Sequence, residues 1–168
     1  MTWSSEVQSK YHQFAKNYIS SYNEKIDCAD LAIAALIEFA AKESLPVRFK
    51  YYSGGWKWIN FVPSKDDKNE FKLRAMRMLG ALNVIDNTSK VTVSAAKPGD
   101  FIMSKWSGSL GHTRVIYSVT PEKSKYKVVW YQGNLPPVKP EKKEDYFSNI
   151  QGVFEQQPRR WSFEQFGE

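Results

Sequence analysis

The sequence predicts an α+β domain in which N-terminal helices pack on an antiparallel β-sheet. In the first half of the chain, apolar residues recur at helical spacing, whereas the second half has short β-branched and aromatic runs separated by Pro, Gly and Ser. Helices followed by consecutive strands are typical of this class. The chain has 168 residues, close to the usual size of one domain, so we expect a single domain over residues 1–168.

The first half contains three expected helices. Apolar side chains line one helical face across residues 4–20. A second helix is expected to begin at Cys28, in the Ala- and Leu-rich segment CADLAIAALIEFAAKE, and to end before Pro46. Residues 68–82 again keep helical spacing. The aromatic segment 47–62 contains a Gly-Gly break, which indicates an irregular strand or a long loop.

The second half contains the expected strands, with the sequences VTVSA, GDFIMSKW, HTRVIYSVT and YKVVWYQG. After them, the segment from Lys139 to Lys143 is interrupted by Pro140 and Glu141, and we interpret it as a solvated loop. The aromatic residues of the C-terminal stretch would be unfavourable in water, so we expect an ordered tail.

Composition argues against several classes of protein. The formal net charge is +6, but the basic residues are scattered and no nucleic-acid-binding motif accompanies them, so we expect no nucleic-acid partner. No apolar run is long enough to span a membrane, and none is expected to insert. The single cysteine excludes an intrachain disulfide, and the usual zinc spacings are absent, so we expect neither a metal nor another cofactor.

Cys28 is a candidate nucleophile because of its place at the expected start of a helix. There the helix dipole and the unpaired backbone N–H groups stabilise a thiolate. Asp27 and Asp30 have the opposite effect, since a neighbouring carboxylate opposes ionisation of the thiol. A buried structural cysteine is the alternative, and a catalytic role therefore requires a base from elsewhere in the chain.

His112 is the candidate base. It opens a strand after the segment SGSLG, whereas His12, the only other histidine, falls on the polar side of the first helix and is expected at the surface. Gln132 and Asn134 end the next strand at alternate positions, on one face, where either would orient the imidazole. Gln132 and Asn134 are equally interpretable as turn residues.

The order of these segments resembles the NlpC-type and CHAP (cysteine, histidine-dependent amidohydrolase/peptidase) enzymes of the papain-like superfamily. The matching pieces are Asp27-Cys28 at the helix start, Pro98-Gly99-Asp100 entering the sheet and Gly111-His112 at a strand start. CHAP enzymes often have Glu-x-Asn on the following strand, and this chain has Gln132-Gly133-Asn134 instead. The resemblance covers roughly residues 24–135 and implies a papain-like fold.

The resemblance also implies a function. Most members of these families cleave amide bonds in peptidoglycan stem peptides or cross-links. A small basic amidase of this kind is similar to antibacterial effectors of type VI secretion, although a phage lysin or a polymorphic toxin would look alike. The N-terminus does not resemble a signal peptide, so we expect synthesis in the cytoplasm, export by another route and action in a target-cell periplasm. An effector would also have a cognate immunity protein as a partner.

Two other functions fit the same residues. A Cys-His pair would serve equally in a deamidase or acyltransferase toxin that acts on a cytoplasmic protein. A non-catalytic wall-binding module would instead use tryptophans, and Trp56, Trp58 and Trp106 either line a groove or belong to the core, which is the commoner place for such residues. Arg114, on the strand face of His112, either binds a substrate carboxylate or pairs with Asp100.

Overall fold

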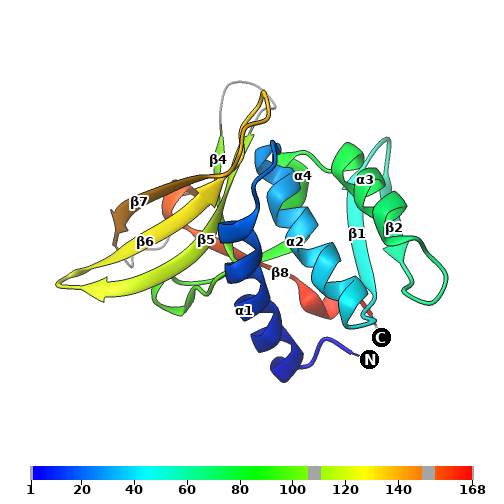
Figure 1. Ribbon diagram of the computed structural model, residues 1–168, viewed down its shortest axis with the longest axis horizontal. Helices are drawn as coiled ribbons and strands as arrows, with labels where there is room; N and C mark the ends of the chain where they lie inside the picture. Colours follow the sequence, from blue (N-terminus) through cyan, green and yellow to red (C-terminus); the bar gives the residue numbers. More distant parts are fainter. Residues whose placement is uncertain (1, 106–110, 149–153, 168) are drawn as a thin grey trace.

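The computed structural model describes residues 2–105, 111–148 and 154–167 and has an α+β fold. Helix α2 (Cys28–Lys42) lies at its centre, between a six-stranded antiparallel sheet and a smaller layer formed by helix α3 (Lys68–Met78) and a β-hairpin (Figure 1). Almost every side chain of α2 is buried, since its sequence is apolar on all sides. The expected α+β class is confirmed.

The first two helices agree with the sequence prediction. Helix α1 (Ser5–Ser21) begins after Ser4, whose hydroxyl accepts a hydrogen bond from the backbone N–H of Val7. Helix α2 begins after Asp27, whose carboxylate accepts from Ala29 N–H at 2.9 Å. Both caps use a short polar side chain at the position where the first turn leaves its N–H groups unpaired.

The segments between α2 and the large sheet differ from the prediction in detail. Residues 47–62 form a regular antiparallel hairpin of β1 (Val47–Tyr52) and β2 (Trp56–Phe61), not an irregular strand or loop. The helix expected over 68–82 ends at Met78 and is followed by the short helix α4 (Ala81–Ile85). The break falls at Gly80, a poor helix former that caps α4 instead.

The large sheet has the strand order β3-β8-β4-β5-β6-β7, and every neighbouring pair in it is antiparallel. Its strands are β3 (Thr88–Lys90), β4 (Phe101–Lys105), β5 (Gly111–Glu122), β6 (Lys125–Gln132), β7 (Glu141–Phe147) and β8 (Pro158–Trp161). Three of these, β4, β5 and β6, correspond to predicted strands.

Two predictions of secondary structure in the second half of the chain were wrong. The VTVSA segment forms a 3₁₀ turn (Val93–Ala95) instead of a strand, and its backbone hydrogen bonds are local, from Ala95 N–H to Thr92 O and from Ala96 N–H to Val93 O. The expected loop around Lys139–Lys143 instead leads into β7, whose charged side chains are tolerated because β7 is an exposed edge strand. Strand β8, within the expected ordered tail, pairs with both β3 and β4.

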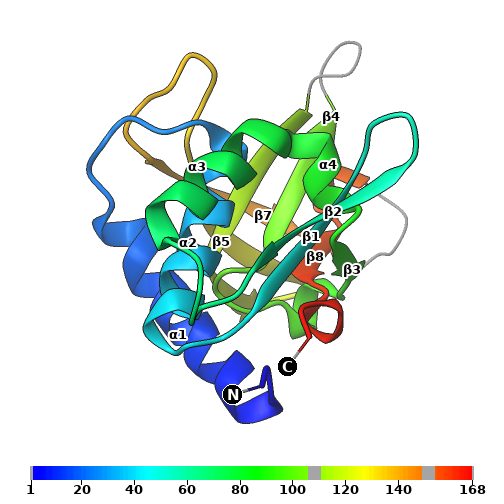
Figure 2. The same ribbon diagram turned by 90° about the vertical axis from the view of Figure 1, so that its right-hand side faces the viewer.

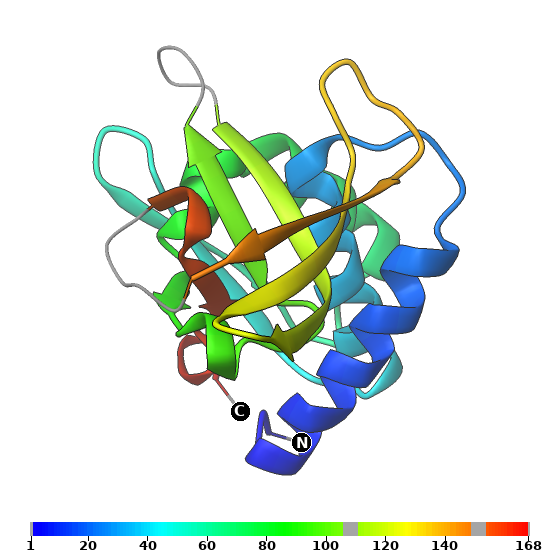
Figure 3. The ribbon, with the colours of Figure 1, turned by 90° about the vertical axis from the view of Figure 1, so that its left-hand side faces the viewer.

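The sheet has an apolar cluster on each face. The helix-facing cluster includes Met103 and Val115 and continues into α1 and α2. The opposite cluster contains Ile116 and Trp130 and is enclosed where β6 and β7 curl across the sheet (Figure 3). Alternation along β5 therefore directs successive side chains into two different environments.

The two termini lie near each other at one end of the molecule (Figure 2). Trp3 stacks on Phe163 with 4.9 Å between ring centroids, and Phe166 packs edge-on against Trp3. Trp161, Phe163 and Phe166 are all buried, so the expected ordered tail is confirmed. Within the described residues, no helix combines the length and the apolar character needed to cross a membrane.

Candidate active site

Cys28 is the first residue of α2, as the sequence predicts. Its side chain is buried, with 4% exposure. Burial raises the pKa of the thiol to about 11, and the charge of Asp27 adds to the rise, whereas backbone hydrogen bonds from Thr113 and Ala29 oppose it. Desolvation therefore outweighs the helix N-terminus here, and the resting sulfur is a thiol near neutral pH.

A second carboxylate lies in the first turn of α2. Burial raises the pKa of Asp30 to about 7, and the neighbouring charge of Asp27 contributes to the rise. Asp27 keeps its role as the helix cap. The two acidic residues near the thiol thus lie in different environments. Asp27 is hydrogen-bonded to the backbone, and Asp30 is desolvated.

His112 is the second residue of β5 and is buried, with 5% exposure. Burial lowers its pKa below the ordinary 6.5 and the positive charge of Arg114 adds to this, while a hydrogen bond with Gln132 and the charge of Asp27 act the other way. The imidazole is therefore neutral near pH 7 and able to accept a proton.

The structure distinguishes the roles of Gln132 and Asn134, the two candidates for the residue that orients His112. Gln132 hydrogen-bonds to His112, and its Oε1 also accepts a hydrogen bond from Trp130 Nε1 at 2.9 Å. Asn134 instead accepts a hydrogen bond from the backbone N–H of Leu135 at 2.8 Å. Gln132 is thus placed to orient the imidazole, and Asn134 shapes the turn that follows β6.

The end of β6 is docked against the residues that precede Cys28. Asn134 N–H donates to the carbonyl of Ile26 at 3.2 Å, and Ile26 also forms an isolated antiparallel bridge with Val138. Gly133 lies so close that a Cβ there would collide with Ile26 O and would lie 2.7 Å from Asp27 O. Only glycine allows this approach, which joins the three sequence segments at one place.

The thiol of Cys28 and the imidazole of His112 contact different neighbours at this site. Cys28 contacts the backbone of Thr113, the residue after His112, whereas the His112 side chain interacts with Gln132 on the β5 face that also carries Ile116. The segments converge, and the direct Cys28–His112 contact stays a prediction.

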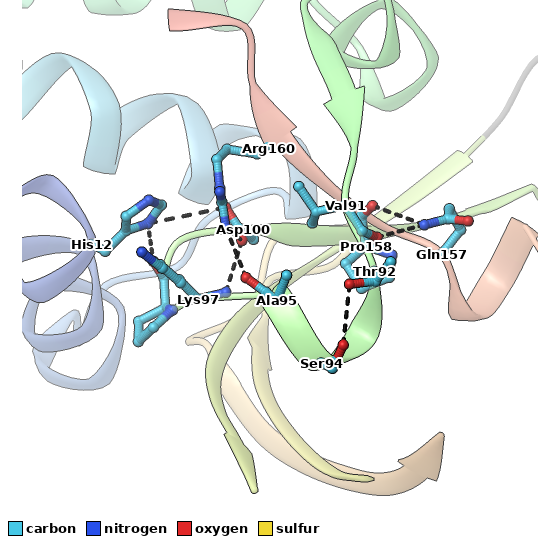
Figure 4. Close-up of polar contacts among 11 residues, drawn as sticks. His12, Val91, Thr92, Ser94, Ala95, Lys97, Asp100, Gln157, Pro158 and Arg160 are labelled. Carbon is cyan, nitrogen blue, oxygen red and sulfur yellow. Dashed lines mark hydrogen bonds and ion pairs between the residues drawn. The ribbon is translucent and has the colours of Figure 1, made fainter. Parts of the chain in front are cut away.

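The Pro98-Gly99-Asp100 motif belongs to a buried polar cluster (Figure 4). Arg160 makes a bidentate ion pair with Asp100, at 2.9 Å from Nε and 2.8 Å from Nη2. His12 lies beside them, with Nδ1 2.7 Å from Pro98 O and 4.0 Å from Asp100 Oδ1. The expected surface position of His12 was wrong: it is buried at 5% exposure, and burial lowers its pKa.

Arg160 takes the place expected for Arg114 beside Asp100. No local pattern pointed to this arginine, which lies 60 residues from its partner and is brought there by the β4–β8 pairing. Arg114 donates to the carbonyl of Glu155 at 2.6 Å, and its guanidinium lies 5.0 Å from the centre of the Trp130 ring. Asp100 thus anchors the entry into β4 and leaves Arg114 beside the Gln132–Trp130 pair.

Two of the three candidate tryptophans, Trp56 and Trp58, lie in the described part of the chain. Trp56 and Trp58 are exposed, at 56% and 39%, so the core interpretation was wrong for both. They alternate along β2 with Lys57 and the buried Ile59, and so share the exposed face of the strand. Trp106 lies outside the described residues.

Among the described residues, no group of three or more His, Cys, Asp and Glu side chains is arranged to hold a metal ion. The groups that the site offers for chemistry include the thiol, the imidazole, the amide of Gln132 and the N-terminus of α2. Comparison of the chain with protein-family models, with curated proteins and with solved structures found no match.

Proposed function

We propose that this chain is a papain-like cysteine hydrolase that cleaves amide bonds in peptidoglycan stem peptides or cross-links. One observation carries the proposal: Cys28 at the start of α2, the His112-Thr113 start of β5 and the Gln132-Gly133 end of β6 are joined by contacts within one site. The starts of α2 and β5 are among the pieces on which the resemblance to NlpC-type and CHAP enzymes rests, and Gln132 stands where CHAP enzymes often have Glu. The peptidoglycan substrate comes from that resemblance alone.

In the proposed reaction His112 acts as a base for a neutral thiol. Because the pKa of Cys28 is raised and that of His112 is lowered, the resting pair is thiol and imidazole, and proton transfer accompanies the attack. In the complex with substrate, the imidazole accepts the proton of the thiol through a hydrogen bond. The sulfur then forms a bond to the amide carbonyl carbon, and His112 holds the proton.

The later steps use the same groups. The N-terminus of α2 offers backbone N–H groups to the oxyanion of the tetrahedral intermediate. His112 returns its proton to the nitrogen as the C–N bond breaks, which leaves a thioester on Cys28. Water, deprotonated by His112, cleaves the thioester and releases a carboxylate while the thiol regains its proton. Gln132 keeps the ring oriented throughout.

The biological setting is part of the proposal. An antibacterial effector would be made in the cytoplasm, exported without a signal peptide and active in the periplasm of a target cell, with an immunity protein as its inhibitor. The experiment is incubation of the purified chain with isolated sacculi, followed by separation of the released muropeptides. New amide-cleavage products are expected from the wild type and none from Cys28→Ala or His112→Ala.

The two variants also test whether the residues act as one unit. Each single variant should lose activity by at least about a thousandfold, and the double variant should lose no more. Circular dichroism must show that both keep the wild-type fold. Full activity in either folded variant would refute the assignment, whereas products made only from a cytoplasmic protein substrate would favour a deamidase or acyltransferase.

A non-catalytic wall-binding module is the second candidate, and specific observations favour it. The thiol is buried with a raised pKa, while two tryptophans are exposed on the β1–β2 hairpin. This candidate predicts that wild type and Cys28→Ala pellet equally with sacculi and that neither releases muropeptides. The same incubation therefore separates the two candidates.

A further inference from the structure

The outward face of the β1–β2 hairpin combines exposed aromatic rings with cations. Tyr52, Trp56 and Trp58 are 63%, 56% and 39% exposed. The register pairs Tyr52 with Trp56 and Lys50 with Trp58, so these side chains lie side by side on one face. Large aromatic side chains exposed as a group mark a binding surface more often than a structural need.

Each tryptophan ring has a cation against it. The Arg48 guanidinium lies 3.9 Å from the centre of the Trp58 ring, and Lys50 Nζ lies 5.1 Å from that of Trp56. Tyr52 packs edge-on against Trp56 with 5.6 Å between centroids. These contacts hold the rings in place before any partner binds, which lowers the entropy lost on association.

We define the aromatic–cation face as the outward residues of the two strands, namely Arg48, Lys50, Tyr52, Trp56, Trp58 and Asn60. It contains two cations and no carboxylate. Acidic residues begin beyond Asn60, where Asp66 and Asp67 line a shallow pocket. The half of the hairpin nearest its tip is therefore the part with a positive potential and flat apolar rings.

We infer that the aromatic–cation face binds a glycan strand that carries carboxylate groups. The apolar side of a sugar ring stacks on an exposed indole, and the adjacent Arg48 and Lys50 meet the carboxylates. The identity of that polymer as peptidoglycan rests on the proposed function. The hairpin tip and the N-terminus of α2 lie at the same end of the molecule (Figures 1 and 2).

Single-stranded nucleic acid is the competing occupant, because it also combines stacking with negative charge. The placement of the cations argues against it. The face has two cations, Arg48 and Lys50, and each lies against an indole, so it lacks the continuous positive groove that follows a nucleic-acid backbone.

The test measures binding without turnover, using the folded Cys28→Ala variant. It is mixed with isolated Gram-negative sacculi, and the fraction that pellets is measured over a range of protein concentrations and at two salt concentrations. Adding Trp56→Ala and Trp58→Ala should weaken pelleting by about tenfold. Adding Arg48→Gln and Lys50→Gln should reduce its salt dependence.

Tyr146→Ala is the matched control, since Tyr146 is also exposed, at 44%, but lies on β7 at the far side of the molecule. It should bind sacculi as well as Cys28→Ala alone. Unchanged pelleting by the tryptophan variant would overturn the inference, as would tighter binding to oligothymidylate than to sacculi. Muropeptide release by the wild type tests the proposed function separately, so either can fail while the other stands.

Discussion

At Cys28, burial and the helix terminus act on the thiol in opposite directions. Desolvation disfavours the thiolate, and the backbone N–H groups at the start of α2 favour it. The net rise in pKa shows that desolvation is the larger effect in the free protein. A nucleophile in this state depends on its base, so the properties of His112 decide at which pH the site works.

The pH dependence of the proposed hydrolysis follows from these shifts. Activity requires unprotonated His112, whose pKa lies below 6.5, and so kcat/KM should rise with pH and level off below neutrality. No loss is expected up to pH 9, because the pKa of Cys28 is about 11. A rate profile on soluble muropeptides checks this.

Alkylation of the single cysteine provides an independent measurement. The thiolate fraction, and with it the rate of iodoacetamide reaction, should still be increasing at pH 9. A rate that is already constant by pH 7 would indicate a preformed thiolate and contradict the neutral-thiol mechanism. His12, also buried, is not coupled to this thiol and should leave the profile unaffected.

Gln132 and Asn134 provide a matched pair of variants. Gln132→Ala removes the hydrogen bond to His112 and should lower kcat by at least about tenfold, with little change in KM. Asn134→Ala removes only the bond from Leu135 N–H and should leave kcat near the wild-type value. Equal effects on kcat would show that Gln132 does not orient the imidazole.

Between elements, the closest approach at the site is that of β6 to the segment before α2. Gly133 lets the strand end lie against the backbone of Ile26 and Asp27, and Ile26 and Val138 then bridge. This contact fixes the position of the α2 N-terminus relative to the sheet. It explains how a helix and a strand more than a hundred residues apart in sequence reach one site.

Gly133→Ala should therefore disturb both stability and activity. The added methyl group meets backbone atoms that cannot move independently, and the free energy of unfolding should fall by about 2 kcal/mol. Gly80→Ala is the control, since its nearest neighbour would be Asn83 Oδ1 at 3.5 Å, and it should cost less than about 1 kcal/mol. Urea unfolding measures both, and equal losses would contradict the steric argument.

Across the whole molecule, the C-terminal segment connects the large sheet with the helical layer. Trp161 packs against Phe101 of β4 at 4.9 Å and against Phe49 of β1 at 5.4 Å between ring centroids. Phe163 and Phe166 extend the same cluster to Trp3. Both ends of the chain thus contribute to one core cluster, and we expect the chain to unfold as one cooperative unit.

Removing residues 158–168 should abolish cooperative unfolding, because it deletes β8 and exposes the aromatic cluster. The milder Trp161→Ala variant should keep the fold and lose about 4 kcal/mol of stability. Glu164→Ala, at an exposed position of the same segment, should leave stability nearly unchanged. A cooperative thermal transition in the truncated chain would show that the segment is only an appendage.

The sequence by itself determined the features that depend on local order. Periodic apolar residues predicted α1 and α2, the Ala- and Leu-rich run placed Cys28 at a helix start, and β-branched runs predicted β4, β5 and β6. The α+β class followed from helices preceding strands. These predictions succeed because the backbone responds to its own neighbours over a few residues.

Only the tertiary structure decided which distant groups meet. It buries His12 against Pro98, gives Asp100 to Arg160, and assigns Gln132 to the imidazole and Asn134 to a turn. It also turns the charged segment after Val138 into an edge strand and leaves Trp56 exposed. Each of these outcomes depends on contacts between strands or helices far apart in the chain. Such contacts produce no periodic pattern in the local sequence from which they could be predicted.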